Sequence, residues 1–317
     1  MASILVTGAN GFVGSALCRT LQVRGETLVG AVRQGAGIGQ VSIGNLDGKT
    51  DWRMALAGCD SVIHLAARVH VMSDKDEDPL RAYREVNVDG TLNLARQAVQ
   101  AGVRRFVFVS SVKVNGESTT TQPFRSSDVP MPCDPYGQSK MEAEQALQQL
   151  GRETGLEVVI VRPPLVYGPG VKANFLNLIK LVQKGVPLPF GSISNFRSMV
   201  ALDNLVDLLI VCSKHPDAPG NIFMVSDGAD MGIKELVTKI ANAMNKRLWL
   251  VPVPVGLMIG AAKLLGKQGV VDRLLGSLQV DIAHTQATLA WQPVVTSQAA
   301  IDKTVEQFFL VNDRKKK

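Results

Sequence analysis

The chain has 317 residues, of which 46% are hydrophobic and 20% are charged, a balance typical of a globular protein that buries its own core. Its formal charge is +6, but the last four residues, Arg314–Lys317, are all basic, and only 5% of the chain is aromatic. The composition therefore argues against nucleic-acid binding, which needs a broad basic face, and residues 312–317 are expected to be a solvated basic tail.

The cysteines and the N-terminal sequence indicate the compartment. Four scattered cysteines without a CxxC pair predict reduced thiols and no metal site. The segment MASILVTGANG lacks the charged and then apolar order of a signal peptide. We therefore expect a cytoplasmic protein that holds no metal.

Apolar runs alternate with helical patterns through the first half of the chain. Strands are predicted at residues 3–6, 28–32, 41–43, 61–66, 106–110 and 158–162, and helices at 11–24, 79–101 and 136–154. This alternation predicts an α/β fold, a doubly wound parallel sheet of the Rossmann type with helices on both faces. Right-handed crossovers would then place the carboxyl ends of the strands at one edge, where ligands bind.

Past residue 163 the chain is rich in proline and glycine, which indicates a smaller C-terminal substrate lobe. Residues 221–225 again have the pattern of a buried strand, so the two parts are expected to be interleaved. The expected division is a dinucleotide-binding domain of residues 1–166 and 203–227 and a substrate-binding lobe of residues 167–202 and 228–311.

The most apolar segment of the chain is Val251–Leu265. It is too short to span a bilayer, so no stable membrane span is expected. We expect a buried helix from about Val255; lining a substrate cleft and touching a membrane surface are the alternatives.

A glycine-rich turn follows the first predicted strand and precedes the first predicted helix. It reads TGANGFVG and contains Gly8, Gly11 and Gly14. Glycines let the backbone approach a pyrophosphate closely, and the free N–H groups at the start of the helix favour its negative charge. The segment therefore predicts a dinucleotide-binding site.

The end of the second predicted strand bears on the choice of cofactor. Proteins that bind NAD usually carry an acidic residue there to hold the ribose, whereas this chain has Arg33. A guanidinium group suits a 2′-phosphate. NADP(H) is therefore the preferred cofactor, with NAD(H) as the alternative if Arg33 points to solvent.

Three residues form a candidate set for proton and hydride transfer. Ser111 follows the strand at 106–110, and Tyr136 and Lys140 are four residues apart on a predicted helix, which places them on one face. Tyr136 would exchange a proton with a carbonyl oxygen, and a serine hydroxyl would bind the same oxygen. The Lys140 ammonium group and an oxidised nicotinamide ring should both favour the phenolate, so a lowered pKa is expected for Tyr136.

Six segments, TGANGFVG, HLAARVH, VNVDGTLNLARQA, FVFVSSVKVNG, YGQSK and VRPPLVYGPG, together resemble the extended short-chain dehydrogenase/reductase family of the NAD-dependent epimerase/dehydratase type. The resemblance implies the doubly wound sheet with a small C-terminal lobe and makes Ser111, Tyr136 and Lys140 the catalytic residues. Besides the three glycines, Arg33, Tyr136 and Lys140, the expected cofactor residues are Asn10, Phe12, Val13, Asn45, Leu46, Leu65, Ala66, Ala67, Asn87, Ser110 and Pro163.

For two of these residues, Asn45 and Asn87, the sequence leaves the role in cofactor binding open. Asn45 stands where the family usually has an aspartate beside the adenine. Asn87 lies on a predicted helix, where it would support the active site through hydrogen bonds or face solvent.

The resemblance also bears on the reaction. Val112 and Lys113 stand where sugar-nucleotide 4,6-dehydratases carry Asp-Glu, so elimination is not expected. Two reactions at C4 of a UDP-(N-acetyl)hexosamine remain. Arg33 and SVKVNG favour the reduction of a UDP-4-keto-6-deoxy-N-acetylhexosamine, as in the enzymes that form UDP-N-acetyl-quinovosamine or -fucosamine for bacterial surface polysaccharides. The alternative is a 4-epimerase for UDP-glucose or UDP-GlcNAc.

Two other kinds of function are compatible with parts of the sequence. The apolar segment Val251–Leu265 suggests a steroid- or flavonol-type ketone reductase as a further alternative. A non-enzymatic NADP(H) sensor is disfavoured because Ser111, Tyr136 and Lys140 are all present.

A UDP-sugar substrate carries two phosphates, and the resemblance implies where they bind. The expected substrate residues are Ser111, Lys113, Asn174, Pro189, Phe190, Arg197 and Arg273. Arg197 would clamp the diphosphate, with Arg273 as a second clamp or a surface arginine. Asn174 would bind phosphate at a helix N-terminus or cap that helix, and Lys113 would touch the sugar or face water. The resemblance also implies a homodimer formed through the helices around 79–101 and 136–154.

Overall fold

The computed structural model describes residues 3–69, 78–264, 266, 269 and 274–314. Its centre is a seven-stranded sheet in which every neighbouring pair of strands is parallel. The strand order is β3-β2-β1-β4-β5-β6-β9, so the direction of winding reverses between β1 and β4. The strands are β1 (Ser3–Thr7), β2 (Leu28–Val32), β3 (Gln40–Ser42), β4 (Cys59–His64), β5 (Arg105–Val109), β6 (Glu157–Arg162) and β9 (Ile222–Met224). The predicted doubly wound sheet is confirmed.

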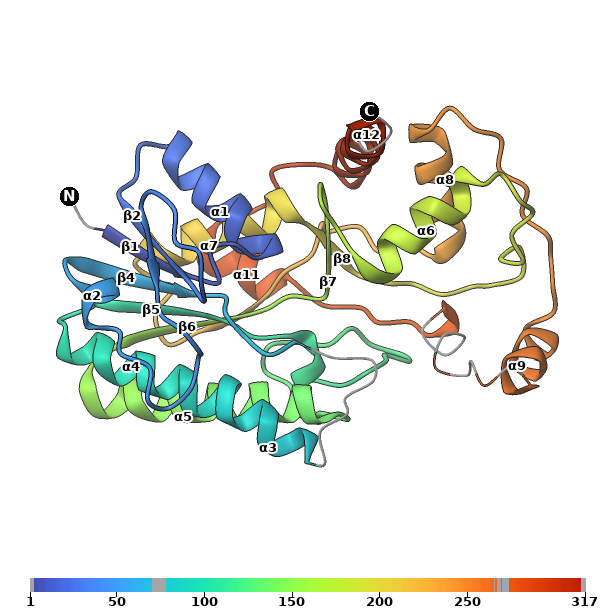
Figure 1. Ribbon diagram of the computed structural model, residues 1–317. Helices are drawn as coiled ribbons and strands as arrows, with labels where there is room; N and C mark the ends of the chain where they lie inside the picture. Colours follow the sequence, from blue (N-terminus) through green and yellow to red (C-terminus); the bar gives the residue numbers. More distant parts are fainter. Residues whose placement is uncertain (1–2, 70–77, 265, 267–268, 270–273, 315–317) are drawn as a thin grey trace.

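Helices cover both faces of this sheet (Figure 1). One layer contains α1 (Phe12–Val23), α7 (Leu202–Lys214) and α11 (Ala283–Leu289); the other contains α2 (Arg53–Leu56), α3 (Pro79–Arg84), α4 (Gly90–Gln100) and α5 (Pro135–Thr154). Because successive side chains of a strand point to opposite faces, Val107 packs in the core under α1 and α7, while Phe106 and Phe108 pack in the core under α4 and α5.

The segment predicted as one helix at 79–101 is interrupted. A π-helical turn, η1 (Glu85–Asp89), lies between α3 and α4. Such a turn inserts an extra residue into the helix and is often found at functional sites. Here it contains Asn87, which is buried.

The C-terminal half of the chain builds a second hydrophobic core. Strands β7 (Leu165–Tyr167) and β8 (Met199–Ala201) pair in parallel, and helices α6 (Ala173–Gln183), α8 (Ile233–Ala243) and α12 (Ser297–Arg314) pack beside them. Phe175 of α6, Ile240 of α8 and Ile301 of α12 are buried together in this core.

The apolar segment near Val255 forms helix α9 (Val255–Leu264), but the helix is not buried. The side chain of Leu257 is 66% exposed and that of Leu264 is 90% exposed, whereas Met258 packs partly against the second core. The expectation of a buried helix is therefore wrong. Among the described residues, no helix is both long and apolar enough to cross a bilayer.

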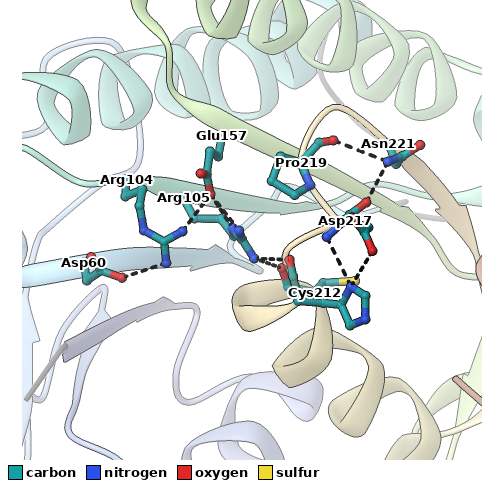
Figure 2. Close-up of polar contacts among 9 residues, drawn as sticks. Asp60, Arg104, Arg105, Glu157, Cys212, Asp217, Pro219 and Asn221 are labelled. Carbon is teal, nitrogen blue, oxygen red and sulfur yellow. Dashed lines mark hydrogen bonds and ion pairs between the residues drawn. The ribbon is translucent and has the colours of Figure 1, made fainter. Parts of the chain in front are cut away.

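At the amino end of the sheet, a buried arginine connects three elements (Figure 2). The guanidinium group of Arg105 on β5 lies 2.7 Å from the Glu157 carboxylate of β6. Its Nη1 donates hydrogen bonds to the carbonyl oxygens of Cys212 and His215 at the end of α7. The N–H that would bond to the Cys212 carbonyl within the helix is missing, because residue 216 is proline, whereas the His215 carbonyl also accepts from the Ala218 N–H at 3.3 Å. Arg105 therefore completes the hydrogen bonding at the end of α7 and fixes the helix against the sheet.

Candidate active site

The glycine-rich turn adopts a backbone that only glycine suits. Gly8 has φ +64°, and a Cβ built on Gly14 would lie 2.1 Å from the carbonyl oxygen of Gly8. The Gly11 N–H donates to the same oxygen at 2.8 Å. The absence of side chains therefore lets the start of α1 pack directly onto the end of β1, with its free N–H groups turned toward the carboxyl edge of the sheet.

A cavity of about 700 Å³ lies along this edge. The structure brings most of the predicted cofactor and catalytic residues together there. The predicted residues that line it are Gly8, Asn10, Gly11, Phe12, Val13, Gly14, Arg33, Leu46, Leu65, Ala66, Ala67, Ser110, Ser111, Tyr136, Lys140 and Pro163. Sequence reasoning missed Ile43, Gly44, Val69, Val86, Val166 and Leu205, apolar or glycine residues whose motifs carry no chemical signal.

Two predicted cofactor residues do not line the cavity. Asn45 is exposed, and its neighbours Gly44 and Leu46 line the cavity instead. Asn87 is buried; its Oδ1 accepts from the Arg68 N–H at 2.8 Å, and its Nδ2 donates to Ser139 Oγ at 3.0 Å. The solvent-facing alternative for Asn87 is therefore wrong, and the side chain instead joins the loop after β4 to helix α5.

A buried threonine–histidine pair holds the start of that loop. Thr7 Oγ1 accepts from the N–H groups of Leu65 and Ala66, both at 3.1 Å. Its hydroxyl proton is then available for His64 Nδ1 at 2.7 Å, so the histidine carries its own proton on Nε2 and donates to Thr91 Oγ1 at 3.0 Å. Burial lowers the pKa of His64 to about 3, so the ring is neutral. The pair holds the ends of β1 and β4 together.

Lys140 is buried below the catalytic edge. Its Nζ donates to the Val109 carbonyl at 2.9 Å and lies 4.5 Å from the centre of the Phe108 ring. Burial lowers the pKa of Lys140 to about 7, and the Glu144 carboxylate one turn away acts in the opposite direction.

Tyr136 lies in the first turn of α5. Burial raises the pKa of its phenol to about 12, with Asp134 acting in the same direction, while a hydrogen bond with Ser111 acts to lower it. The lowered pKa expected from the sequence is therefore wrong for the chain by itself, because burial of the phenol outweighs the hydrogen bond with Ser111.

Ser111, which follows strand β5, lies within hydrogen-bonding reach of Tyr136. It begins the short 3₁₀ turn η2 (Val112–Val114), in which its Oγ accepts from the Lys113 N–H at 3.2 Å. The Lys113 side chain contacts two carboxylates, with Nζ 2.5 Å from Asp134 Oδ2 and 2.6 Å from Glu117 Oε1.

Four of the other predicted substrate residues do not line the cavity. Asn174 is exposed in the first turn of α6, whose N-cap is Lys172, so its alternative role as the helix cap is wrong. Phe190 is buried, Pro189 is exposed, and Arg197 Nη1 donates to the Gly276 carbonyl at 3.1 Å. Arg273 lies outside the described residues. All of these positions belong to the C-terminal half of the chain, and the contact of Asn174, Pro189, Phe190 and Arg197 with a substrate remains a prediction.

The residues of the cavity fit a nicotinamide dinucleotide. The glycine turn leaves room for a pyrophosphate against the backbone N–H groups. Ser110 Oγ is buried and borders the cavity, and it has no hydrogen-bond partner among the described residues. A polar ligand would satisfy it.

Comparison with known proteins agrees with this fit. The family model for NAD-dependent epimerase/dehydratase proteins matches residues 4–226. The chain belongs to this family. A UDP-glucose 4-epimerase of Vibrio cholerae is 48% identical over 98% of this chain and 97% of its own length. The 4-epimerase of N-acetyl-glucosaminyl-diphospho-undecaprenol from Escherichia coli O157:H7 is 27% identical over 97% of this chain and 96% of its own length.

Solved structures of other proteins share the fold. MoeE5 in complex with UDP-glucose and NAD superposes with a TM-score of 0.77, covering 98% of this chain and 100% of its own, at 23% identity. The UDP-glucose 4-epimerase of Thermotoga maritima, solved with UDP-glucose, also gives a TM-score of 0.77, covering 98% of this chain and 99% of its own, at 22% identity.

Proposed function

We propose that the chain is a UDP-sugar 4-epimerase that retains NAD(H). The observation that carries this proposal is the 48% identity, over 98% of the chain, to a UDP-glucose 4-epimerase. The complete set of Ser111, Tyr136 and Lys140 at one cavity supports it. The proposal favours the epimerase over the reductase that the sequence alone favoured.

When bound, a nicotinamide cofactor would supply the acceptor for a hydride from C4 of the sugar and the donor for its return. The rest of the chemistry falls to the chain. Tyr136 accepts the proton of the C4 hydroxyl as the alcohol becomes a ketone and gives it back on the return step. The Ser111 hydroxyl donates a hydrogen bond to the same oxygen, and the glycine turn holds the cofactor diphosphate.

The environment of Tyr136 makes this proton transfer depend on its neighbours. A phenol with a pKa of about 12 is a weak acid, and burial is the main cause. A positive charge on Lys140 and a hydrogen bond from Ser111 are the means by which the chain can stabilise the phenolate.

Interconversion of UDP-sugars without added cofactor tests the proposal. Purified protein is incubated with UDP-glucose and, in a parallel reaction, with UDP-GlcNAc, and the products are separated by chromatography. We expect the C4 epimer to form up to its equilibrium share. No epimer from either sugar, together with consumption of NADPH in the presence of a UDP-4-keto-6-deoxy-N-acetylhexosamine, would replace the proposal by the reductase.

One observation favours that second candidate, the 4-keto reductase. Arg33 lines the cavity at the end of β2, where a 2′-phosphate would lie. The substitution Arg33→Ser separates the cofactors: it should weaken NADP(H) binding about tenfold or more and leave NAD(H) binding little changed if the guanidinium binds a phosphate. Equal effects on both cofactors would remove the argument for NADP(H).

The steroid-type alternative is tested by the effect of UDP on thermal unfolding. UDP should raise the midpoint of thermal unfolding, whereas a steroid reductase would show no effect.

We also propose the interleaved domain division given above, a cytoplasmic location and a homodimer through the α3–α4 and α5 helices. Light scattering of the purified protein would test the homodimer.

A further inference from the structure

Lys113 lies between the two segments that carry the reacting side chains. Ser111 begins the η2 turn, and Tyr136 lies in the first turn of α5. The Lys113 ammonium group belongs to η2 but contacts Asp134, the N-cap of α5, at 2.5 Å. Its other partner, Glu117, is 2.6 Å away, and the Lys113 side chain is only 26% exposed.

Both oxygens of the Asp134 carboxylate are engaged. Oδ1 accepts from the Gly137 N–H at 2.6 Å and so caps the helix, while Oδ2 faces the Lys113 ammonium group. The backbones are also close, because a Cβ built on Gly137 would lie 2.7 Å from the Lys113 carbonyl oxygen. The η2 turn and the first turn of α5 are therefore in direct contact.

This arrangement also balances charge beside the phenol. The negative charge of Asp134 raises the pKa of Tyr136, and the Lys113 ammonium group faces Asp134. Among the residues that the structure describes, Lys140, one turn further along α5, and Tyr83 of α3, whose ring centre is 6.0 Å away, are further titratable neighbours of Tyr136. Glu117 faces Lys113 from the far side.

We propose that Lys113 is a positioning residue that fixes Ser111 against Tyr136 and compensates the charge of Asp134. In this role it acts through Asp134 and does not touch the sugar. The inference rests on the proposed C4 chemistry for its kinetic test, and a second test does not depend on turnover.

The kinetic test uses two single variants and their combination. Lys113→Met should remove a positive charge from beside Asp134, lower kcat about tenfold with KM for the UDP-sugar little changed, and move the acidic limb of the pH–rate profile to higher pH. Asp134→Asn keeps a capping oxygen for Gly137 and removes the charge. Added to Lys113→Met, it should return the pH–rate profile toward that of the wild type. Glu117→Gln is the matched control and should change neither constant more than about twofold.

Two kinetic results would contradict the positioning role of Lys113. A rise in KM of tenfold or more with kcat unchanged in Lys113→Met would make Lys113 a substrate ligand and overturn the inference. A profile that does not move in Lys113→Met, or that is not restored in the double variant, would overturn it as well.

The second test is hydrogen exchange measured by mass spectrometry on the protein alone. Lys113→Met should speed exchange in peptides that cover residues 111–116 and 134–139, and Lys113→Arg, which keeps the charge, should not. Unchanged exchange in both segments would overturn the inference whether or not the protein epimerises UDP-sugars. If the protein lacks 4-epimerase activity but shows this exchange pattern, the proposed function fails and the positioning role stands.

Discussion

The two ends of the parallel sheet use their polar groups differently. At the amino end, Arg105 is almost fully buried and satisfied by Glu157 and by two carbonyls of α7 (Figure 2). At the carboxyl end, Ser110 Oγ is buried without a partner among the described residues, and Lys140 has a pKa lowered to about 7. The first end is arranged to hold the fold, and the second keeps polar groups available for a ligand at some cost in stability.

The largest expected effect is at the carboxyl end. Tyr136→Phe removes the phenolic oxygen and should lower kcat by about 10²–10⁴-fold, the usual contribution of a positioned acid–base group. The midpoint of thermal unfolding should stay within a few degrees. Steady-state kinetics and circular dichroism measure the two quantities.

Tyr83→Phe is the matched control for that variant. Its ring packs beside Tyr136, and its hydroxyl donates a long hydrogen bond, 3.3 Å, to the Val69 carbonyl. We expect it to retain most of the activity. A loss as large as that of Tyr136→Phe would show that the assay reports the packing of this region and not the chemistry of one phenol.

At the amino end of the sheet, a substitution should lower the stability of the protein and leave its kcat unchanged. Arg105→Met leaves the Cys212 carbonyl without its donor and the His215 carbonyl with only the Ala218 N–H, and it should lower the free energy of unfolding by about 2–3 kcal/mol. The kcat of the folded fraction should not change. Urea denaturation followed by circular dichroism measures the loss.

The neighbouring Arg104 provides the control. It contacts the same Glu157, at 3.1 Å, but its side chain is 50% exposed. Arg104→Met should cost less than about 1 kcal/mol. If the two substitutions cost the same, burial is not what makes the amino end stable.

A further expected effect is a pH dependence of stability. The pKa of Lys140 is lowered from 10.5 to about 7, so between these values the unfolded chain holds a proton that the native state has released. The free energy of unfolding should therefore increase with pH across this window and level off above it. Denaturation at several pH values, for the wild type and for Lys140→Met, should show a weaker rise in the variant. The exposed Lys180→Met should keep the wild-type slope, and identical slopes in all three proteins would contradict the lowered pKa.

Local patterns made part of the fold and site predictable from the sequence. The glycine turn, the strand that ends at Ser110 and the spacing of Tyr136 and Lys140 each depend on a short stretch of chain, and the structure places all of them around one cavity. Their roles in binding and catalysis remain predictions. The parallel sheet was predictable because its strands are buried on both faces and alternate with amphipathic helices.

The remaining features depend on tertiary contacts. The Thr7–His64 pair joins two strands that are far apart in the sequence, and the ion pair of Lys113 with Asp134 spans 21 residues. The exposure of α9 could not be read from its composition, because an apolar run is the same whether or not another element covers it. The direction of the Tyr136 pKa shift depended on burial, which the motif does not encode.

The π turn at Glu85–Asp89 lies within the continuous helical segment α3–η1–α4. The number of residues in this segment therefore decides which way its side chains point. The segments on either side of the turn have different rotational phases about the helix axis. Adding or removing one residue here would carry Asn87 about 100° around that axis, away from both Arg68 and Ser139. The same change in a surface loop would be absorbed locally, so this helix tolerates a change of residue type far better than a change in the number of residues.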